Sequence, residues 1–388
     1  MEIANRISRI QPSITLEMTA KAAELKQAGI DVVNLSVGEP DFDTPINIKE
    51  AAHSAIERGM TKYTAGSGIP ELKNAIIDKL KRDNNLDYNL NNIIVSCGGK
   101  HTLYNACQVL FQKGDEVIIF SPYWVSFPDF VAITGAKPVI VPTIPEKQYE
   151  PDFSFLEKAI NSNTKGIIIN SPSNPTGGVW GDEAIKKTLD IAKKNNLWVF
   201  SDECYEQLTY DIKFKSIQEY DLSNERILTF QSCSKTYSMT GWRIGYTAGH
   251  PDIIKAMSKI QSQSTSCPNS IAQYAAVEAL SGDQSEVFKM KSVFQKRRDF
   301  IVSELNQIDG VSCETPGGAF YVFPSLEGLI KSNKIKSSWD FCFQLLEEKA
   351  IASVPGRSFG AENNIRFSYA ISSERIKLAI QRIKELLG

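Results

Sequence analysis

The sequence contains few of the residues that build metal sites and disulfide frameworks. Its 388 residues include three histidines and seven cysteines, an odd number with no CxxC pair. This composition argues against a disulfide framework and a zinc site of cysteine and histidine ligands, although carboxylates alone can bind Mg²⁺. We therefore expect reduced, mostly buried thiols and no metal.

Long apolar runs and a strong charge of one sign are also lacking. No run approaches the roughly 18 apolar residues that cross a bilayer, and the N-terminal MEIANRISRI has no apolar signal-peptide stretch. With 43 Lys+Arg against 45 Asp+Glu, the formal net charge is -2. We therefore expect a cytoplasmic protein that binds neither membrane nor nucleic acid through bulk charge.

The residues that are present have an ordinary globular composition, with 42% hydrophobic and 23% charged residues. The length predicts two domains. Short apolar runs alternate with amphipathic helical patterns at 100–113, 124–134, 152–161 and 182–194. The seven predicted strands are Ile93–Ser96, Glu116–Phe120, Pro138–Val141, Gly166–Asn170, Leu197–Ser201, Ile227–Gln231 and Ile244–Thr247. Apolar strands separated by helices predict an α/β fold with a mostly parallel seven-stranded sheet covered by helices.

The C-terminal part has a different pattern. A long amphipathic stretch from Asp283 to Ile308 precedes a predicted strand Ala319–Phe323, a helix 337–349, a strand Ile365–Tyr369 and a helix 372–387. We therefore predict a large domain at 46–284, and a smaller α+β domain formed by 285–388 together with the N-terminal segment 1–45.

Unusual residues follow the predicted strands, and open α/β sheets bind their ligands at the carboxyl ends of strands. After strand 93–96, Gly98-Gly99-Lys100 begins a helix, where backbone N–H groups can bind an anion such as phosphate. After strand 166–170, two prolines and two glycines at 171–178 hold Asn174 in a rigid loop. Each segment by itself is equally compatible with an ordinary turn.

Two further strand ends carry charged groups. Asp202 follows strand 197–201, where a carboxylate can pair with a cationic ring nitrogen or simply cap a helix. Lys235 follows strand 227–231, eight residues before Arg243. A lysine in such a place can form a Schiff base with an aldehyde, and the apolar character of residues 239–246 argues against an exposed loop.

The four strand ends together carry a phosphate-binding turn, a fixed amide, a carboxylate and a lysine–arginine pair. Pyridoxal 5′-phosphate presents a phosphate, a ring nitrogen, a phenolic oxygen and an aldehyde, which are the groups that this set could bind. We therefore predict this cofactor.

The sequence also resembles the class I aminotransferases of the fold-type I pyridoxal-phosphate enzymes, most closely the bacterial thermophile-like aspartate and aspartate–prephenate aminotransferase branch. The resemblance runs from about Ser13 to the C-terminus. Ten motifs carry it: Ser13-Ile14-Thr15, Val37-Gly38-Glu39-Pro40-Asp41-Phe42, Tyr63-Thr64-Ala65-Gly66, Gly98-Gly99-Lys100, Ser121-Pro122-Tyr123-Trp124, Asn174-Pro175-Thr176-Gly177, Ser201-Asp202-Glu203-Cys204-Tyr205, Ser232-Cys233-Ser234-Lys235, Gly241-Trp242-Arg243-Ile244-Gly245 and Arg366-Phe367-Ser368-Tyr369. It implies an aspartate aminotransferase-like fold.

The resemblance implies a role for each cofactor-binding residue. Lys235 holds the cofactor covalently and moves a proton on the substrate, while Asp202 keeps the ring nitrogen protonated. Tyr205 and Asn174 bind the phenolic oxygen, and Trp124 stacks on the ring. The phosphate is bound by Gly99, Lys100, Ser232, Arg243 and, from the neighbouring subunit, Tyr63. The last of these implies a homodimer with shared active sites.

Substrate recognition is implied in the same way. Arg366, helped by the Gly38 backbone, binds the α-carboxylate, with Trp124 and Asn174 beside the substrate; an interdomain ion pair is the alternative for Arg366. Lys100, with hydroxyls of Ser13 and Thr15, binds the side-chain carboxylate, unless it serves the phosphate alone. The segment 261–266, which aligns approximately with an arginine-bearing loop of other family branches, contains no arginine.

We therefore predict an aminotransferase that moves an amino group between aspartate or glutamate and 2-oxo acids by a ping-pong mechanism. A prephenate, aromatic, alanine or kynurenine aminotransferase of the same family remains open. So do an enzyme of this fold that cleaves C–S bonds or forms cyclopropane rings, and a ligand-sensing domain without turnover. The last is disfavoured because no helix-turn-helix region or linker is present and the Lys235, Asp202 and Arg366 set is complete.

Overall fold

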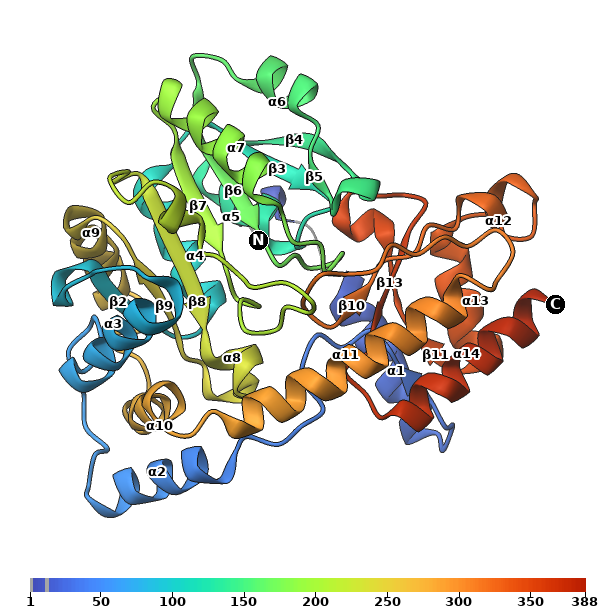
Figure 1. Ribbon diagram of the computed structural model, residues 1–388, viewed down its shortest axis with the longest axis horizontal. Coiled ribbons are helices and arrows are strands. Elements are labelled where there is room, and N and C mark those ends of the chain that lie inside the picture. Colours follow the sequence, from blue (N-terminus) through green and yellow to red (C-terminus); the bar gives the residue numbers. More distant parts are fainter. Residues whose placement is uncertain (1–2, 11–13) are drawn as a thin grey trace.

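The computed structural model describes residues 3–10 and 14–388. An eight-stranded sheet forms its centre, in the order β2-β9-β8-β7-β6-β3-β4-β5 (Figure 1). The strands are β2 (Ile93–Ser96), β3 (Glu116–Ser121), β4 (Lys137–Ile144), β5 (Glu150–Pro151), β6 (Thr164–Asn170), β7 (Trp198–Asp202), β8 (Ile227–Ser232) and β9 (Gly245–Ala248). The five strands from β8 to β4 run parallel, β9 is antiparallel to both of its neighbours, and β5 is antiparallel to β4.

All seven predicted strands are present, and the sheet is mostly parallel as expected. The predicted number of strands is wrong, because β5 adds an eighth. β5 has only two residues, which pair with Thr143 and Ile144 where the chain turns back after β4. A two-residue pairing has no hydrophobic periodicity, so it leaves no pattern in the sequence.

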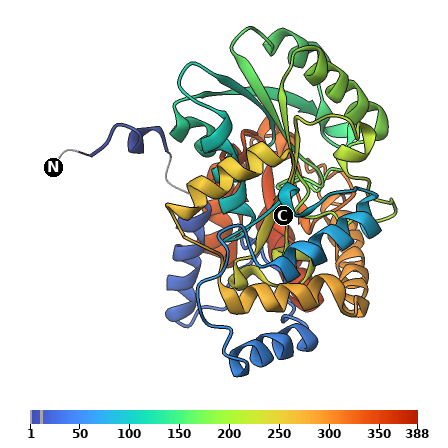
Figure 2. The same ribbon diagram turned by 90° about the vertical axis from the view of Figure 1, so that its left-hand side faces the viewer.

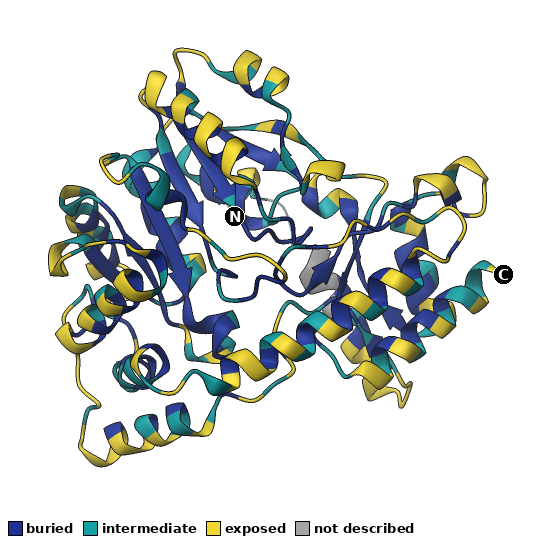
Figure 3. Cartoon of the chain, viewed as in Figure 1, coloured by how far each residue is buried: buried dark blue, intermediate teal, exposed yellow. Residues whose placement is uncertain are grey.

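Helices cover both faces of the sheet because its strands are apolar on both sides. One face packs against α4 (Gly99–Leu110), α5 (Ser126–Thr134) and α9 (Pro251–Ser262). The other packs against α6 (Phe153–Ala159) and α7 (Asp182–Lys194). Figure 3 shows the result, with buried strands between helices whose outer faces are exposed. Beyond the sheet, α3 (Pro70–Asn84) and α2 (Ile46–Glu57) both pack on α10 (Ser270–Ser281), and α2 lies at the periphery in both views (Figures 1 and 2).

The N-terminal segment with α1 (Ile14–Gln27) and β1 (Val33–Asn34) lies against the C-terminal part of the chain, beside the long helix α11 (Ser285–Leu305) (Figure 1). β1 pairs in parallel with β11 (Ile351–Ala352), and the Arg375 guanidinium lies 2.7 Å from the Asp31 carboxylate. Near them lie the antiparallel strands β10 (Tyr321–Val322), β13 (Ile365–Ser368) and β12 (Val354–Pro355), and the helices α12 (Glu327–Lys331), α13 (Ser338–Lys349) and α14 (Ser373–Leu387). The domain boundaries at 45/46 and 284/285 stay predictions. Within the described ranges, no helix has the length and apolarity needed to cross a membrane.

Candidate functional site

A cavity of about 910 Å³ opens at the carboxyl ends of the parallel strands, between the sheet and the C-terminal elements. Most of the predicted site residues line it: Gly38, Gly99, Lys100, Trp124, Asn174, Asp202, Tyr205, Ser232, Lys235, Arg243 and Arg366. Three predicted residues are not among them. Ser13 lies outside the described residues, and for Thr15 only the backbone, in α1, is described. Tyr63 is 91% exposed and does not line the cavity of its own chain.

One end of the cavity is suited to an anion. Gly98, at a φ of +91°, leads into α4, whose first N–H groups have no side-chain cap. Gly245 of β9 packs against the first residues of α4. A Cβ atom on Gly245 would lie only 2.3 Å from the backbone nitrogen of Gly99. A Cβ on Gly99 would contact the Ser232 side chain at 3.4 Å, and the Arg243 guanidinium is anchored on the Thr240 carbonyl at 2.8 Å. Helix N–H groups, a hydroxyl and a guanidinium thus converge, as in phosphate sites.

Asp202, at the end of β7, is nearly buried beside this anion site. Burial raises the pKa of Asp202 to about 7; the Cys204 N–H, which donates to Oδ1 at 3.2 Å, opposes the rise, and the neighbouring Glu203 adds to it. A cation bound in the cavity would favour the ionised form of this carboxyl.

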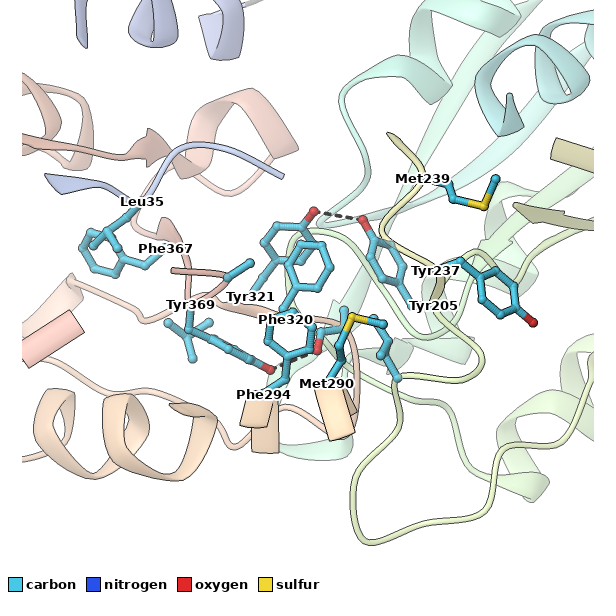
Figure 4. Close-up of a cluster of buried hydrophobic side chains, with 14 of the residues drawn as sticks. Leu35, Tyr205, Tyr237, Met239, Met290, Phe294, Phe320, Tyr321, Phe367 and Tyr369 are labelled. Carbon is cyan, nitrogen blue, oxygen red and sulfur yellow. Dashed lines mark hydrogen bonds between the residues drawn. The ribbon is translucent and has the colours of Figure 1, made fainter. Parts of the chain in front are cut away.

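Tyr205 lies three residues further on, in the turn after β7, and contacts a residue from the C-terminal part of the chain. Its hydroxyl is 2.9 Å from the hydroxyl of Tyr321 in β10 (Figure 4). Burial raises the pKa of Tyr205 well above its usual range. Both phenols are therefore neutral, and since one hydroxyl donates to the other, one O–H remains available as a hydrogen-bond donor at the cavity wall.

Lys235 comes from α8 (Cys233–Thr236), the short helix directly after β8, and its ammonium group donates to the Gly38 carbonyl. Burial lowers the pKa of Lys235, and the nearby Arg366 and Arg243 guanidinium groups act in the same direction against Cys204 and Glu39. A lowered pKa favours the neutral amine, which is the nucleophilic form.

Arg366 of β13 is 3% exposed and reaches the same cavity. Its guanidinium donates to Asn174 Oδ1 at 2.9 Å and to the Ser36 carbonyl at 2.6 Å, between the rings of Tyr321 and Phe359. In the described part of the chain no carboxylate pairs with Arg366, and its buried Nε has no hydrogen-bond partner. The alternative of an interdomain ion pair is thus not observed there, and a buried cation of this kind favours an anionic ligand.

Lys100 and Trp124 form another part of the wall. The Lys100 ammonium lies 5.0 Å from the centre of the Trp124 ring, which packs edge-on against Phe127. Burial and Arg243 lower the pKa of Lys100, while Asp129 opposes this shift. Lys100 is therefore close enough to Arg243 to interact with it, and it also lines the open cavity. Its position is compatible with both predicted roles, binding of the phosphate and binding of the substrate side-chain carboxylate.

Comparison with known proteins assigns the family. The family model "Aminotransferase class I and II" matches residues 30–383. The chain belongs to this family. The predicted resemblance, fold class and enzyme class are thereby confirmed: the protein is an aminotransferase.

Relatives and solved structures agree with this family. A probable aspartate/prephenate aminotransferase of Rhizobium leguminosarum bv. phaseoli is 48% identical, over 100% of this chain and 98% of the relative. An aspartate aminotransferase of Bacillus subtilis (strain 168) is 45% identical, over 100% and 99%. The crystal structure of the aspartate aminotransferase from Rhizobium meliloti superposes with a TM-score of 0.94 at 41% identity, over 100% of this chain and 99% of that one. The aspartate aminotransferase from Thermus thermophilus with maleate gives 0.94 at 38%, over the full length of both.

The aminotransferase cavity also contains polar residues that the sequence analysis missed. Asn170, at the end of β6, accepts the Asn174 N–H at 2.8 Å and donates to the Asp202 carbonyl at 3.2 Å, so it holds two predicted site residues together. Its signal was available, because it is the polar last residue of a predicted strand. Tyr321 had no such signal, since it lies in a short apolar strand far along the chain from Tyr205.

Proposed function

We propose that this aminotransferase exchanges the amino group of aspartate or glutamate with 2-oxo acids, using pyridoxal 5′-phosphate bound in the cavity, by a ping-pong mechanism. The observation that carries the proposal is the position of Arg366. A buried guanidinium without an acidic partner lines the same cavity as the Lys235 amine. A guanidinium binds a carboxylate with two parallel hydrogen bonds, as recognition of an amino acid or 2-oxo acid requires.

The donor and acceptor set of the cavity fits the cofactor. The family depends on pyridoxal phosphate. The N-terminus of α4, Ser232 and Arg243 provide donors for a phosphate, and the buried Asp202 carboxyl provides an acceptor for a ring N–H. When bound, the cofactor would withdraw electrons from the substrate Cα and so make its proton acidic.

The chain's own residues would do the remaining work. The lowered pKa of Lys235 would leave its amine neutral, so that it could accept the proton of the substrate Cα. Asp202 would keep the ring nitrogen protonated, Tyr205 and Asn174 would donate to the phenolic oxygen, and Trp124 would cover the ring. Arg366 would hold the α-carboxylate, with the Gly38 backbone beside it, and so fix which substrate bond faces Lys235.

Lys100 supports a dicarboxylate substrate, because it adds a cation to the cavity wall besides Arg366, which is assigned to the α-carboxylate. We propose that it binds the side-chain carboxylate, with Ser13 and Thr15 as further donors. Prephenate is a second candidate acceptor, since the relative from Rhizobium leguminosarum is named a probable aspartate/prephenate aminotransferase.

We also propose a homodimer in which the exposed Tyr63 reaches the phosphate of the neighbouring subunit, as its 91% exposure allows. We further propose that the chain divides into two domains, with boundaries at 45/46 and 284/285, and that the protein is cytoplasmic.

A substrate panel tests the function. The purified protein, reconstituted with pyridoxal phosphate, is assayed with aspartate, glutamate, alanine, phenylalanine and kynurenine as donors. Oxaloacetate, 2-oxoglutarate and prephenate serve as acceptors. Aspartate or glutamate should give the highest kcat/KM. A preference for a neutral or aromatic donor would contradict the dicarboxylate assignment, and cofactor binding without transfer in any combination would favour the ligand-sensing alternative.

A further inference from the structure

A network of buried polar side chains lies behind the cavity wall, and the proposed reaction does not use it. It joins α3 to the turn after β7 and to strands β8 and β9. Its charged members are nearly inaccessible: Lys79 is 1% exposed, Glu203 0% and Glu206 6%. Burying three charges is costly unless each has partners, so the arrangement needs a physical reason.

Lys79 and Glu206 form the first part of the network. The Lys79 ammonium pairs with Glu206 Oε1 and also donates to Asn84 Oδ1 at 2.7 Å and to Gln231 Oε1 at 2.8 Å. Glu206 Oε2 accepts from Asn84 Nδ2 at 2.8 Å and from Gln231 Nε2 at 3.0 Å. The ammonium group and the carboxylate thus neutralise each other within a complete set of hydrogen bonds.

Glu203 is the second carboxylate, and no cation pairs with it among the described residues. Its Oε1 accepts from Ser201 Oγ at 2.7 Å, Ser216 Oγ at 2.8 Å and the Ile217 N–H at 3.1 Å. Its Oε2 accepts from Gln231 Nε2 at 3.1 Å, the same amide that donates to Glu206. This donor set solvates an ionised carboxylate.

The titration of Glu203 reflects two opposing effects. Burial, followed by the negative charge of Glu206, raises the pKa of Glu203 to about 7, and the Ser201 and Ser216 hydroxyls and the Ile217 N–H oppose this rise. The other ionisable groups that face the network are Tyr88, Tyr237, Tyr246, Cys233, Asp202 and Glu219. Burial raises the pKa of each of them, and the three tyrosines and the thiol are therefore neutral. Since the Lys79–Glu206 ion pair is neutral as a whole, an ionised Glu203 gives the network one net negative charge.

This charge lies directly behind the cofactor-binding residues. Glu203 directly follows Asp202 in the chain, and Glu206 directly follows Tyr205. Both glutamates therefore lie on the same turn as these two cavity residues. Gln231, which bridges the two glutamates, also lines the cavity. The orientation of the turn and the electrostatic potential at Asp202 therefore both depend on the network.

We propose that Glu203 is a positioning residue that acts through Asp202, and that its uncompensated buried charge increases the proton affinity of the bound cofactor. The proposal rests on the proposed function, because it concerns the hold of Asp202 on pyridoxal phosphate. It assigns separate roles within the network: the Lys79–Glu206 pair fixes the turn, and Glu203 supplies the charge.

The test compares holoenzymes that differ in the charge of the network. Glu203→Gln keeps the shape of the side chain and removes one negative charge. The near-visible absorption band of the bound cofactor is titrated from pH 6 to 10, and the cofactor dissociation constant is measured at pH 8. Because the protonated form of the cofactor loses a favourable charge, the midpoint of the titration should fall by about 0.5–1 pH unit and binding should weaken roughly three- to ten-fold. Should Glu203→Gln fail to fold, Glu206→Gln leaves Lys79 to offset the charge of Glu203, which also makes the network less negative by one charge and should shift the midpoint in the same direction.

Two controls separate charge from structure. The double variant Lys79→Met/Glu206→Gln removes the ion pair without changing the net charge, so its midpoint should stay near that of the wild type even if it unfolds at lower temperature. Glu116→Gln removes a carboxylate at the opposite end of the sheet, where β3 begins, and should also leave the midpoint unchanged. The inference would be overturned if the titration midpoint of Glu203→Gln equalled that of the wild type, or if the double variant shifted the midpoint as much as Glu203→Gln does. A wild-type protein that forms no near-visible band would instead refute the proposed function.

Discussion

Replacement of Arg366 by lysine tests the central assignment of the cavity. A lysine keeps the positive charge, but its single nitrogen cannot contact Asn174 Oδ1, the Ser36 carbonyl and a substrate carboxylate with the geometry of a guanidinium. Charge-assisted hydrogen bonds contribute about 1.5–3 kcal/mol each. The loss of one of them predicts a decrease in kcat/KM of roughly 10- to 150-fold for every amino acid substrate.

The matched substrate for this variant is 3-aminopropanoate, which is aspartate without its α-carboxyl group. Its reaction with the cofactor-loaded enzyme is followed through the change in the near-visible band. Arg366→Lys should leave that rate within about three-fold of the wild type, because the contact that is lost does not exist for this amine. Equal losses for aspartate and 3-aminopropanoate would refute a role of Arg366 in α-carboxylate binding and indicate a general disturbance of the cavity. Thermal unfolding of the loaded variant controls for stability.

Three other variants test the remaining assignments. Lys235→Ala should bind pyridoxal phosphate without forming the near-visible band of the wild type; a variant that keeps this band would show that another group holds the cofactor. Lys100→Ala should reduce kcat/KM about ten-fold or more further for aspartate than for phenylalanine, and equal losses would exclude Lys100 from side-chain recognition. Burial raises the pKa of Asp202 from 3.8 to about 7, so in the cofactor-free protein this carboxyl costs stability increasingly as the pH rises through that range. The Tm gain of cofactor-free Asp202→Asn over the wild type should therefore grow between pH 4 and 7.5, whereas a constant difference would contradict the shift.

The sheet and most of the cavity could be predicted because their signals are local. Each parallel strand is a short apolar run, and its last residues lie at the same edge of the sheet as those of its neighbours. Residues as far apart as Gly99, Asn174, Asp202 and Lys235 therefore line one cavity, as the sequence indicated. The eighth strand escaped prediction because two residues carry no periodicity.

Contacts between distant segments could not be predicted in this way. Tyr321 binds Tyr205 only because β10 packs beside the turn after β7 (Figure 4). Lys79 is an unremarkable lysine in an amphipathic helix pattern, and nothing near it in the sequence indicates that it is buried against Glu206. Burial of a charge depends on the whole packing of the chain rather than on its neighbours in sequence.

The sequence by itself determined the fold class, the family and the identity of most residues that line the cavity, because hydrophobic periodicity and strand-end motifs are properties of continuous segments. Only the tertiary structure decided that Arg366 has no acidic partner in the described part of the chain, that Tyr63 is exposed and does not line the cavity, and that the Glu203 carboxyl is buried without a cation partner among the described residues. The physical reason is that an ion pair, an exposed surface and a desolvated charge are defined by the atoms around a side chain, and those atoms come from segments far away in the sequence.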